Sequence, residues 1–140
     1  MGRALIVAGD IGGTKTYLAA FDPNAQDFSP VAERRYETIL YASAGALLAA
    51  FTAETDTHAA HVVIGVPGPV RQLPVRAVNL PWFIDPDEIS TALGGVEVHL
   101  LNDLQATSYG TLALTTDDLY PLNKGSEDKE GNIAVVAAGT

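Results

Sequence analysis

A stretch near the start of the chain combines residue types that can bind phosphate. It runs from Ala8 to Thr16 and holds Asp10, a Gly-Gly turn and then Thr14-Lys15-Thr16. Glycines let a backbone pass close to a ligand and point amide N–H groups at it. Hydroxyls, a cation and one carboxylate complete what a phosphate chain carrying Mg²⁺ needs. The stretch is therefore a candidate phosphate-binding turn.

The same stretch also fits an ordinary hairpin with a polar tip, and a lone Gly-Gly favours neither interpretation. Apolar runs at residues 4–7 and 17–21 flank the turn and predict two strands joined as a hairpin. The turn is not a P-loop, because the G-x-x-x-x-G-K spacing is absent and a strand, not a helix, is expected to follow.

A second candidate site is the pair Asn102-Asp103, at the junction of a predicted strand (96–101) and a predicted helix (104–114). An amide beside a carboxylate can hold a sugar hydroxyl from two sides. The carboxylate can accept the hydroxyl proton as that oxygen attacks a phosphoryl group. Taken alone, the pair is more simply explained as a helix start, with Asp103 as the cap.

The remaining elements are predicted from hydrophobic period and capping signals. Residues 31–39 indicate a polar edge strand, and Ser43 can cap a helix reaching about Glu54. A strand over 61–66 ends in Pro67-Gly68-Pro69, and residues 73–80 form a short excursion. Asp85-Pro86-Asp87-Glu88 predicts a helix start, with Glu88 completing a capping box and Gly94-Gly95 ending the helix.

These elements follow the order β-β-β-α-β-α-β-α, which predicts an α/β domain with a mixed five-stranded sheet and helices on both faces. Residues 1–114 are expected to form this domain. Residues 115–140 are expected to be a linker and the first strand, Ile133 to Ala138, of a truncated second domain. An exposed strand of this kind could pair with a second copy, so a homodimer is possible.

Composition narrows the classes of function. A chain of 140 residues with 47% hydrophobic residues predicts a globular domain. A net charge of −9 argues against nucleic acid or anionic membranes as partners. The absence of cysteine, of a signal peptide and of a long apolar span fits a cytoplasmic protein.

The motifs resemble those of the bacterial glucokinases, within the actin-like sugar kinases. The segment from Leu100 to Gly110 is similar to the glucokinase pattern around the catalytic aspartate, and the Glu-Asn-Asp-Ala-Asn type of the ROK kinases is absent. The segments 8–16, 65–69, 78–82 and 138–140 also resemble glucokinase loops. Lys15 departs from the family, because many glucokinases have Asn there. The resemblance implies a ribonuclease-H-like half-domain of the actin-like ATPase fold.

The resemblance also implies roles. ATP would phosphorylate glucose at its 6-hydroxyl, with Asp103 as general base and with Asn102, Pro67, Gly68 and Asn79 near the sugar. Asp10 would bind Mg²⁺, through water, and Trp82 is expected to pack in the core or at a hinge. The remaining implied residues are nucleotide ligands: Gly12, Gly13, Thr14, Lys15, Gly139 and Thr140.

Other functions fit parts of the same pattern. A kinase of this fold could act on another hexose or an N-acetylhexosamine. A non-catalytic ROK-like sugar-sensing domain would carry a helix-turn-helix at its N-terminus, and an actin-like or chaperone-like ATPase would not need the Asn102-Asp103 pair. Because known relatives close two domains on the sugar, the 140-residue chain is expected to be inactive alone.

Overall fold

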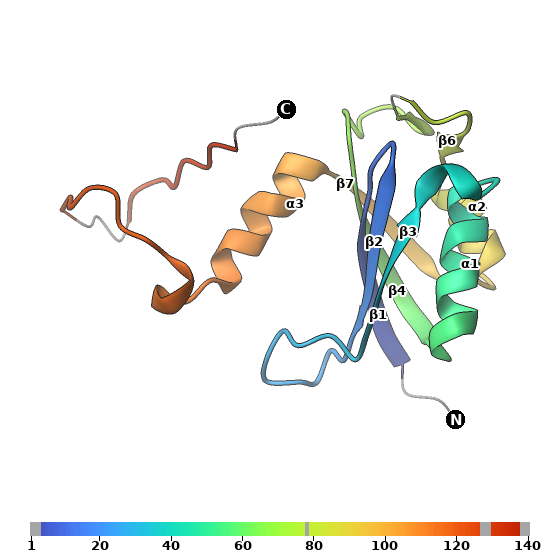
Figure 1. The fold of residues 1–140 in the computed structure, drawn as a ribbon, viewed down its shortest axis with the longest axis horizontal. Helices are drawn as coiled ribbons and strands as arrows, with labels where there is room; N and C mark the ends of the chain where they lie inside the picture. Colours follow the sequence, from blue (N-terminus) through green and yellow to red (C-terminus); the bar gives the residue numbers. More distant parts are fainter. Residues whose placement is uncertain (1–3, 78, 127–129, 138–140) are drawn as a thin grey trace.

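The computed structural model of this chain describes residues 4–77, 79–126 and 130–137. A five-stranded sheet with strand order β3-β2-β1-β4-β7 forms its centre (Figure 1). β1 pairs antiparallel with β2, and β2 antiparallel with β3. β4 pairs parallel with β1, and β7 parallel with β4. The five strands are β1 (Ala4–Ile11), β2 (Lys15–Phe21), β3 (Ala32–Glu37), β4 (His58–Val66) and β7 (Glu97–Asn102).

The mixed sheet and the predicted edge position of the third strand are confirmed. β3 is followed by a 3₁₀ turn, η1 (Thr38–Leu40), so the strand ends earlier than its hydrophobic pattern suggested. The predicted excursion between β4 and the second helix is a small antiparallel ladder of β5 (Val75–Arg76) and β6 (Phe83–Ile84).

Helix α1 (Ala44–Thr55) forms as predicted. The Ser43 side chain accepts a hydrogen bond from the Ala46 N–H at 3.1 Å, which satisfies one free donor of the first turn. The helix packs its apolar stripe against the sheet, burying four residues completely: Ala44, Leu47, Leu48 and Phe51. These side chains meet the inward-facing residues of β1, β2 and β4 and form most of the core.

Helix α2 (Pro86–Ala92) starts at the predicted cap, where the Asp85 carboxylate accepts from the Asp87 N–H at 3.0 Å. The helix ends at Gly94 and Gly95, whose φ angles of 84° and 93° lie in the left-handed region. Trp82 packs against the core, and its ring N–H donates to the Tyr41 carbonyl at 2.8 Å, as expected for a packing role.

The capping box predicted for Glu88 is wrong. Its carboxylate does not turn back to its own helix but binds the start of α1. It accepts from the Ser43 hydroxyl at 2.7 Å and from the Gly45 N–H at 2.9 Å. A negative charge at a helix N-terminus is favourable, and bonds to a charged acceptor are stronger than neutral ones. Glu88 therefore joins the two helices that cover one face of the sheet.

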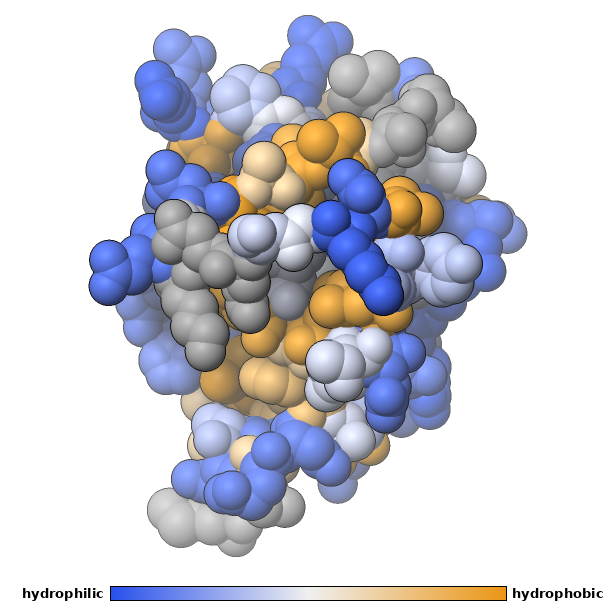
Figure 2. Space-filling model, turned by 90° about the vertical axis from the view of Figure 1, so that its left-hand side faces the viewer, coloured by the Kyte–Doolittle hydropathy of each residue, from blue (hydrophilic) through white to orange (hydrophobic). Residues whose placement is uncertain are grey.

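The opposite face of the sheet is largely open. Helix α3 (Asp103–Gly110) starts at the end of β7 and projects away from the sheet, and none of its residues is buried (Figure 1). It is followed by two 3₁₀ turns, η2 (Thr111–Ala113) and η3 (Thr116–Asp118). Figure 2 shows this side of the molecule, with apolar side chains gathered at its centre and hydrophilic ones around them. The sequence predicts helices on both faces of the sheet. On this face the only helix among the described residues is α3, and it contacts the sheet at one end only.

The predicted strand from Ile133 to Ala138 is not observed. Residues 133–137 have no regular secondary structure, and Ala138 lies outside the described residues. A strand is stabilised by the ladder it forms with a neighbour, and no neighbouring strand pairs with these residues in the part of the chain that is described. No helix in the described part of the chain is both long and apolar enough to span a membrane.

The contact between α1 and α2 gives a test of packing. An ideal Cβ on Gly45 would lie 2.3 Å from Glu88 Oε1 and 2.8 Å from the Ala92 Cβ. Ala normally stabilises a helix relative to Gly by about 1 kcal/mol. We expect Gly45→Ala to lower the free energy of unfolding instead, by about 1–3 kcal/mol, because the second helix must shift. Urea denaturation measures the change.

The matched control is Gly110→Ala. Gly110 has helical backbone angles, φ −60° and ψ −30°, and a Cβ there meets nothing within 4 Å. This variant should be as stable as the wild type or slightly more stable. Equal effects of the two substitutions would contradict the packing described for Gly45.

Candidate functional site

The two predicted sites meet at one edge of the sheet. β1, β4 and β7 run parallel, so their carboxyl ends lie together. Asp10 on β1 pairs with Gly65 on β4, and Gly65 pairs with Leu101 on β7, one residue before Asn102. Asp10 and the Asn102-Asp103 pair are therefore about two strand spacings apart, roughly 10 Å along the sheet.

Gly65 lies beside the Asp10 carboxylate and the first turns of α3. An ideal Cβ on this residue would lie 3.6 Å from Asp10 Oδ1 and 3.4 Å from the Ala106 Cβ on α3. The Asp10 carboxylate and the first turns of α3 thus approach the same glycine from two sides. The sequence indicates Gly65 only as part of the glucokinase-like segment 65–69 and gives it no role of its own, because a glycine inside a strand can equally mark a bulge.

The pKa of Asp10 also indicates that Asp103 is close enough to affect it. Partial burial raises the pKa of the Asp10 carboxyl above its ordinary value, and the negative charge of Asp103 raises it further. A partly buried carboxylate that a second negative charge repels favours a cation beside it. Among the described residues, no group of three or more acidic, histidine or cysteine side chains could hold a metal ion. Mg²⁺ is commonly held by one or two carboxylates, with phosphate and water completing its shell, and Asp10 could be such a ligand.

The hairpin tip provides the donors. Gly12 and Gly13 form the turn between β1 and β2, and the Gly12 N–H donates to the Lys15 carbonyl at 3.0 Å. In the part of the chain that is described, no hydrogen bond engages the N–H groups of Gly13 and Thr14. Lys15, the first residue of β2, is exposed and makes no ion pair with any described residue. Two free amides and a free ammonium group can bind an anion here.

Asn102 and Asp103 have different structural roles at the start of α3. Asn102 is the cap of α3: its side-chain oxygen accepts from the N–H groups of Leu104 and Gln105, at 3.1 and 3.3 Å. Its amide donates to the Gly68 carbonyl at 3.0 Å and so fixes the loop after β4. Asp103 is the first residue of the helix, and its Oδ1 accepts from the Leu104 N–H at 2.8 Å.

The other oxygen of Asp103 is available to a ligand. Among the described residues, none donates a hydrogen bond to Oδ2, and the residue is exposed. Asn102, not Asp103, occupies the cap position, although Asp103 also binds the Leu104 N–H of the first turn. A free carboxylate oxygen beside a helix N-terminus suits a group that accepts a proton from a bound hydroxyl.

The structure gives less evidence that the other predicted site residues belong to this site. Pro67 and Gly68 follow β4, and Gly68 has a φ of 134°. Asn79 is exposed, with a φ of 70°, and makes no hydrogen bond to the site among the described residues. Val78 lies outside the described residues. The predicted nucleotide ligands Gly139 and Thr140 lie outside them as well.

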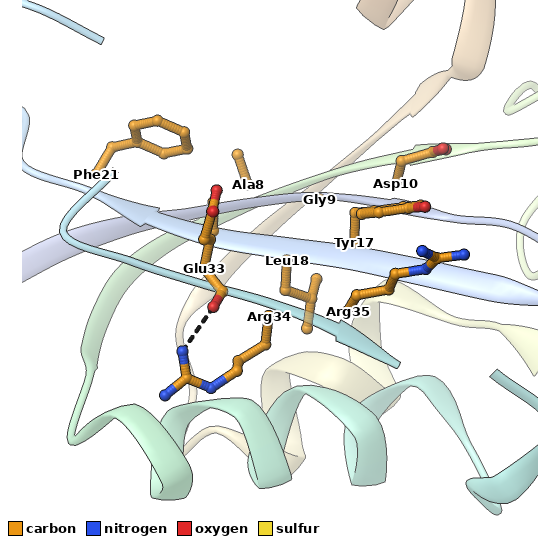
Figure 3. A pocket seen from close by; sticks show the side chains of 10 residues that line it. Ala8, Gly9, Asp10, Tyr17, Leu18, Phe21, Glu33, Arg34 and Arg35 are labelled. Carbon is orange, nitrogen blue, oxygen red and sulfur yellow. Dashed lines mark hydrogen bonds between the residues drawn. The ribbon is translucent and has the colours of Figure 1, made fainter. Parts of the chain in front are cut away.

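A broad hollow of about 670 Å³ lies beside the site on the open face of β1, β2 and β3 (Figure 3). Asp10 is the one predicted site residue in its lining, which otherwise includes Ala8, Tyr17 and Phe21. The Arg35 guanidinium lies 5.2 Å from the centre of the Tyr17 ring. The hollow is thus mainly apolar sheet surface and differs in chemistry from the hairpin tip and Asp103.

The raised pKa of Asp10 predicts how stability depends on pH. The stability that protonation of Asp10 contributes is fully present below the ordinary pKa of an aspartate. It is lost as the pH rises through the higher pKa of the folded chain. We expect Asp10→Asn to be more stable than the wild type at pH 7, with a difference that shrinks on acidification. Urea denaturation between pH 4 and pH 7 measures it.

The control for removing one negative charge is Asp56→Asn, at the exposed C-terminal end of α1. It should change the stability less than Asp10→Asn does at pH 7. A less stable Asp10→Asn protein at that pH would contradict the burial and repulsion described for Asp10.

Comparison with known proteins agrees with this geometry. A family model described as glucokinase matches residues 7–140. Glucokinase of Trichormus variabilis is 30% identical over 139 residues, which cover 97% of this chain and 41% of that protein.

Two solved structures share the fold. A glucokinase from an Antarctic psychrotroph has a TM-score of 0.76 at 21% identity, covering 89% of this chain and 40% of that one. A ROK family glucokinase from Streptomyces griseus, in complex with glucose and AMPPNP, has a TM-score of 0.61 at 22% identity, covering 79% and 36%. The chain thus spans about two fifths of the length of these relatives. With its actin-like sugar-kinase fold and a family match over nearly its whole length, the chain belongs to the glucokinase family.

Proposed function

We propose that the complete protein transfers the γ-phosphoryl group of ATP to the 6-hydroxyl of glucose. The observation that carries the proposal is the meeting of Asp10, the hairpin amides and a free Asp103 oxygen at one edge of the sheet. Support also comes from the glucokinase family match and from the related Streptomyces griseus protein, which is in complex with glucose and AMPPNP.

Asp103 acts as the general base in this reaction. Its carboxylate accepts the proton of the sugar hydroxyl as that oxygen attacks the γ-phosphorus. The bond to the leaving ADP oxygen breaks, and glucose 6-phosphate, ADP and a proton result. Asn102 fixes the start of α3 and the loop at Gly68, which places the base beside the sugar.

The N-terminal hairpin holds the phosphates. The N–H groups of Gly13 and Thr14 and the ammonium group of Lys15 bind phosphate oxygens, in a site that is fixed before the nucleotide arrives. Mg²⁺ held near Asp10 would neutralise charge on the phosphate chain.

The domain organisation follows from the same proposal. Residues 1–114 form the smaller domain, and residues 115–140 are the linker and the beginning of a second domain. In this account Gly139 and Thr140 contact the nucleotide from the other side, and Asn79 and Pro67 line the sugar side. The exposed apolar residues after α3, including Leu119 and Leu122, would then pack in the complete protein.

The role of Asp103 as the general base can be tested by substitution. In the complete protein, Asp103→Asn should lower kcat for glucose phosphorylation by about 10²- to 10⁴-fold, because the proton acceptor is lost. A coupled assay of ATP-dependent glucose phosphorylation measures it. Asp27→Asn, which changes an exposed loop aspartate at the other end of β2, should keep wild-type activity.

Full activity of Asp103→Asn would remove Asp103 as the base. Activity of the wild type on another sugar but not on glucose would keep the mechanism and change the substrate.

A second prediction concerns the isolated chain. The 140 residues should show no measurable turnover of glucose, because closure of two domains is needed to exclude water from the transfer. The same coupled assay, with the complete protein as the positive control, tests this. Measurable turnover of glucose by the 140-residue chain would contradict this prediction.

A further inference from the structure

The hairpin tip is held by a residue that belongs to neither of its strands. Thr38 follows β3 and starts the turn η1. Its N–H donates to the Thr14 carbonyl at 3.0 Å, and its hydroxyl shares a hydrogen bond of 2.9 Å with the Thr16 hydroxyl. Both Thr38 and Thr16 are 0% exposed. One buried side chain and its backbone thus contact the tip on both sides of Lys15.

These contacts determine the direction of the tip peptides. The carbonyl and the N–H of one planar peptide unit point in opposite directions. The bond from Thr38 to the Thr14 carbonyl therefore also fixes the Lys15 N–H. Beyond the tip, β2 pairs with β3, with Lys15 opposite Glu37 and Thr16 opposite Tyr36, so the strand before Thr38 also holds β2. Among the described residues, the N–H groups of Gly13 and Thr14 have no hydrogen-bond partner, although the Thr14 carbonyl is bound to Thr38.

We infer that Thr38 is a positioning residue for nucleotide phosphates, an inference that rests on the function proposed above. A Gly-Gly turn is flexible, and ordering it on binding would weaken affinity. Thr38 fixes the turn in advance, so that Gly13 and Thr14 present their N–H groups without reorganisation. It contacts no substrate itself and acts through Thr14 and Thr16. Nothing in its sequence context, at the end of a polar strand, indicates this role.

The test uses three variants of the complete protein. Thr38→Val keeps the shape and removes the hydroxyl, and Thr38→Ser is the conservative control. The double variant Thr16→Val/Thr38→Val removes both hydroxyls, so that no buried polar group is left unpaired. The urea midpoint should therefore fall in Thr38→Val and recover in the double variant.

Kinetics separate positioning from stability. The KM for ATP should rise about tenfold in Thr38→Val and in the double variant, the effect expected for one lost buried hydrogen bond. The KM for glucose should stay within about twofold, and Thr38→Ser should behave as the wild type. A wild-type KM for ATP in both valine variants would overturn the inference, whatever their stability.

A second readout distinguishes failure of this inference from failure of the proposed function. If the complete wild type phosphorylates no sugar, the proposed function fails, and the ¹⁵N–¹H spectrum of the 140-residue chain decides on Thr38. Inorganic pyrophosphate should shift the Gly13 and Thr14 signals in the wild type and in Thr38→Ser, and much less in the valine variants. No shift in the wild type, or equal shifts in all variants, would overturn the inference.

Discussion

The parallel pairing of β1, β4 and β7 is the constraint on which the rest of the structure depends. Parallel strands bring their carboxyl ends to one edge, and the residues proposed to carry the chemistry end these strands. The register places Asp10 level with Gly65, and Val66 level with Asn102. A shift by one residue would turn Asp10 to the other face of the sheet, toward the helices, and would separate it from Asp103.

The two faces of the sheet have different tasks. One face is covered by α1 and α2, which Glu88 joins through Ser43 and Gly45, and the hydrophobic core lies between these helices and the sheet. The other face is open and mainly apolar around β1, β2 and β3, with α3 touching only the end of the sheet. The proposed site thus lies where the end of the sheet meets its open face.

Local signals in the sequence predict the local structure well. The hairpin, the Ser43 and Asp85 caps and the stop at Gly94-Gly95 depend on neighbouring residues, and the structure confirms them. Interactions between distant residues could not be predicted in the same way. Glu88 binds Ser43 and Gly45, which lie 45 and 43 positions earlier in the sequence. Asn102 binds Gly68, 34 positions earlier. The strand expected over 133–138 shows the same limit, because an apolar run becomes a strand only when a partner strand is present.

We propose that the hairpin tip binds the phosphates and Asp103 the sugar hydroxyl in one phosphoryl transfer. A crystal structure of the complete protein with glucose and a non-hydrolysable ATP analogue would show both contacts. We predict the analogue's phosphates against the N–H groups of Gly13 and Thr14, and the glucose 6-hydroxyl within hydrogen-bond distance of the Asp103 carboxylate. Phosphates bound away from the hairpin, or a sugar whose 6-hydroxyl lies away from Asp103, would contradict the account.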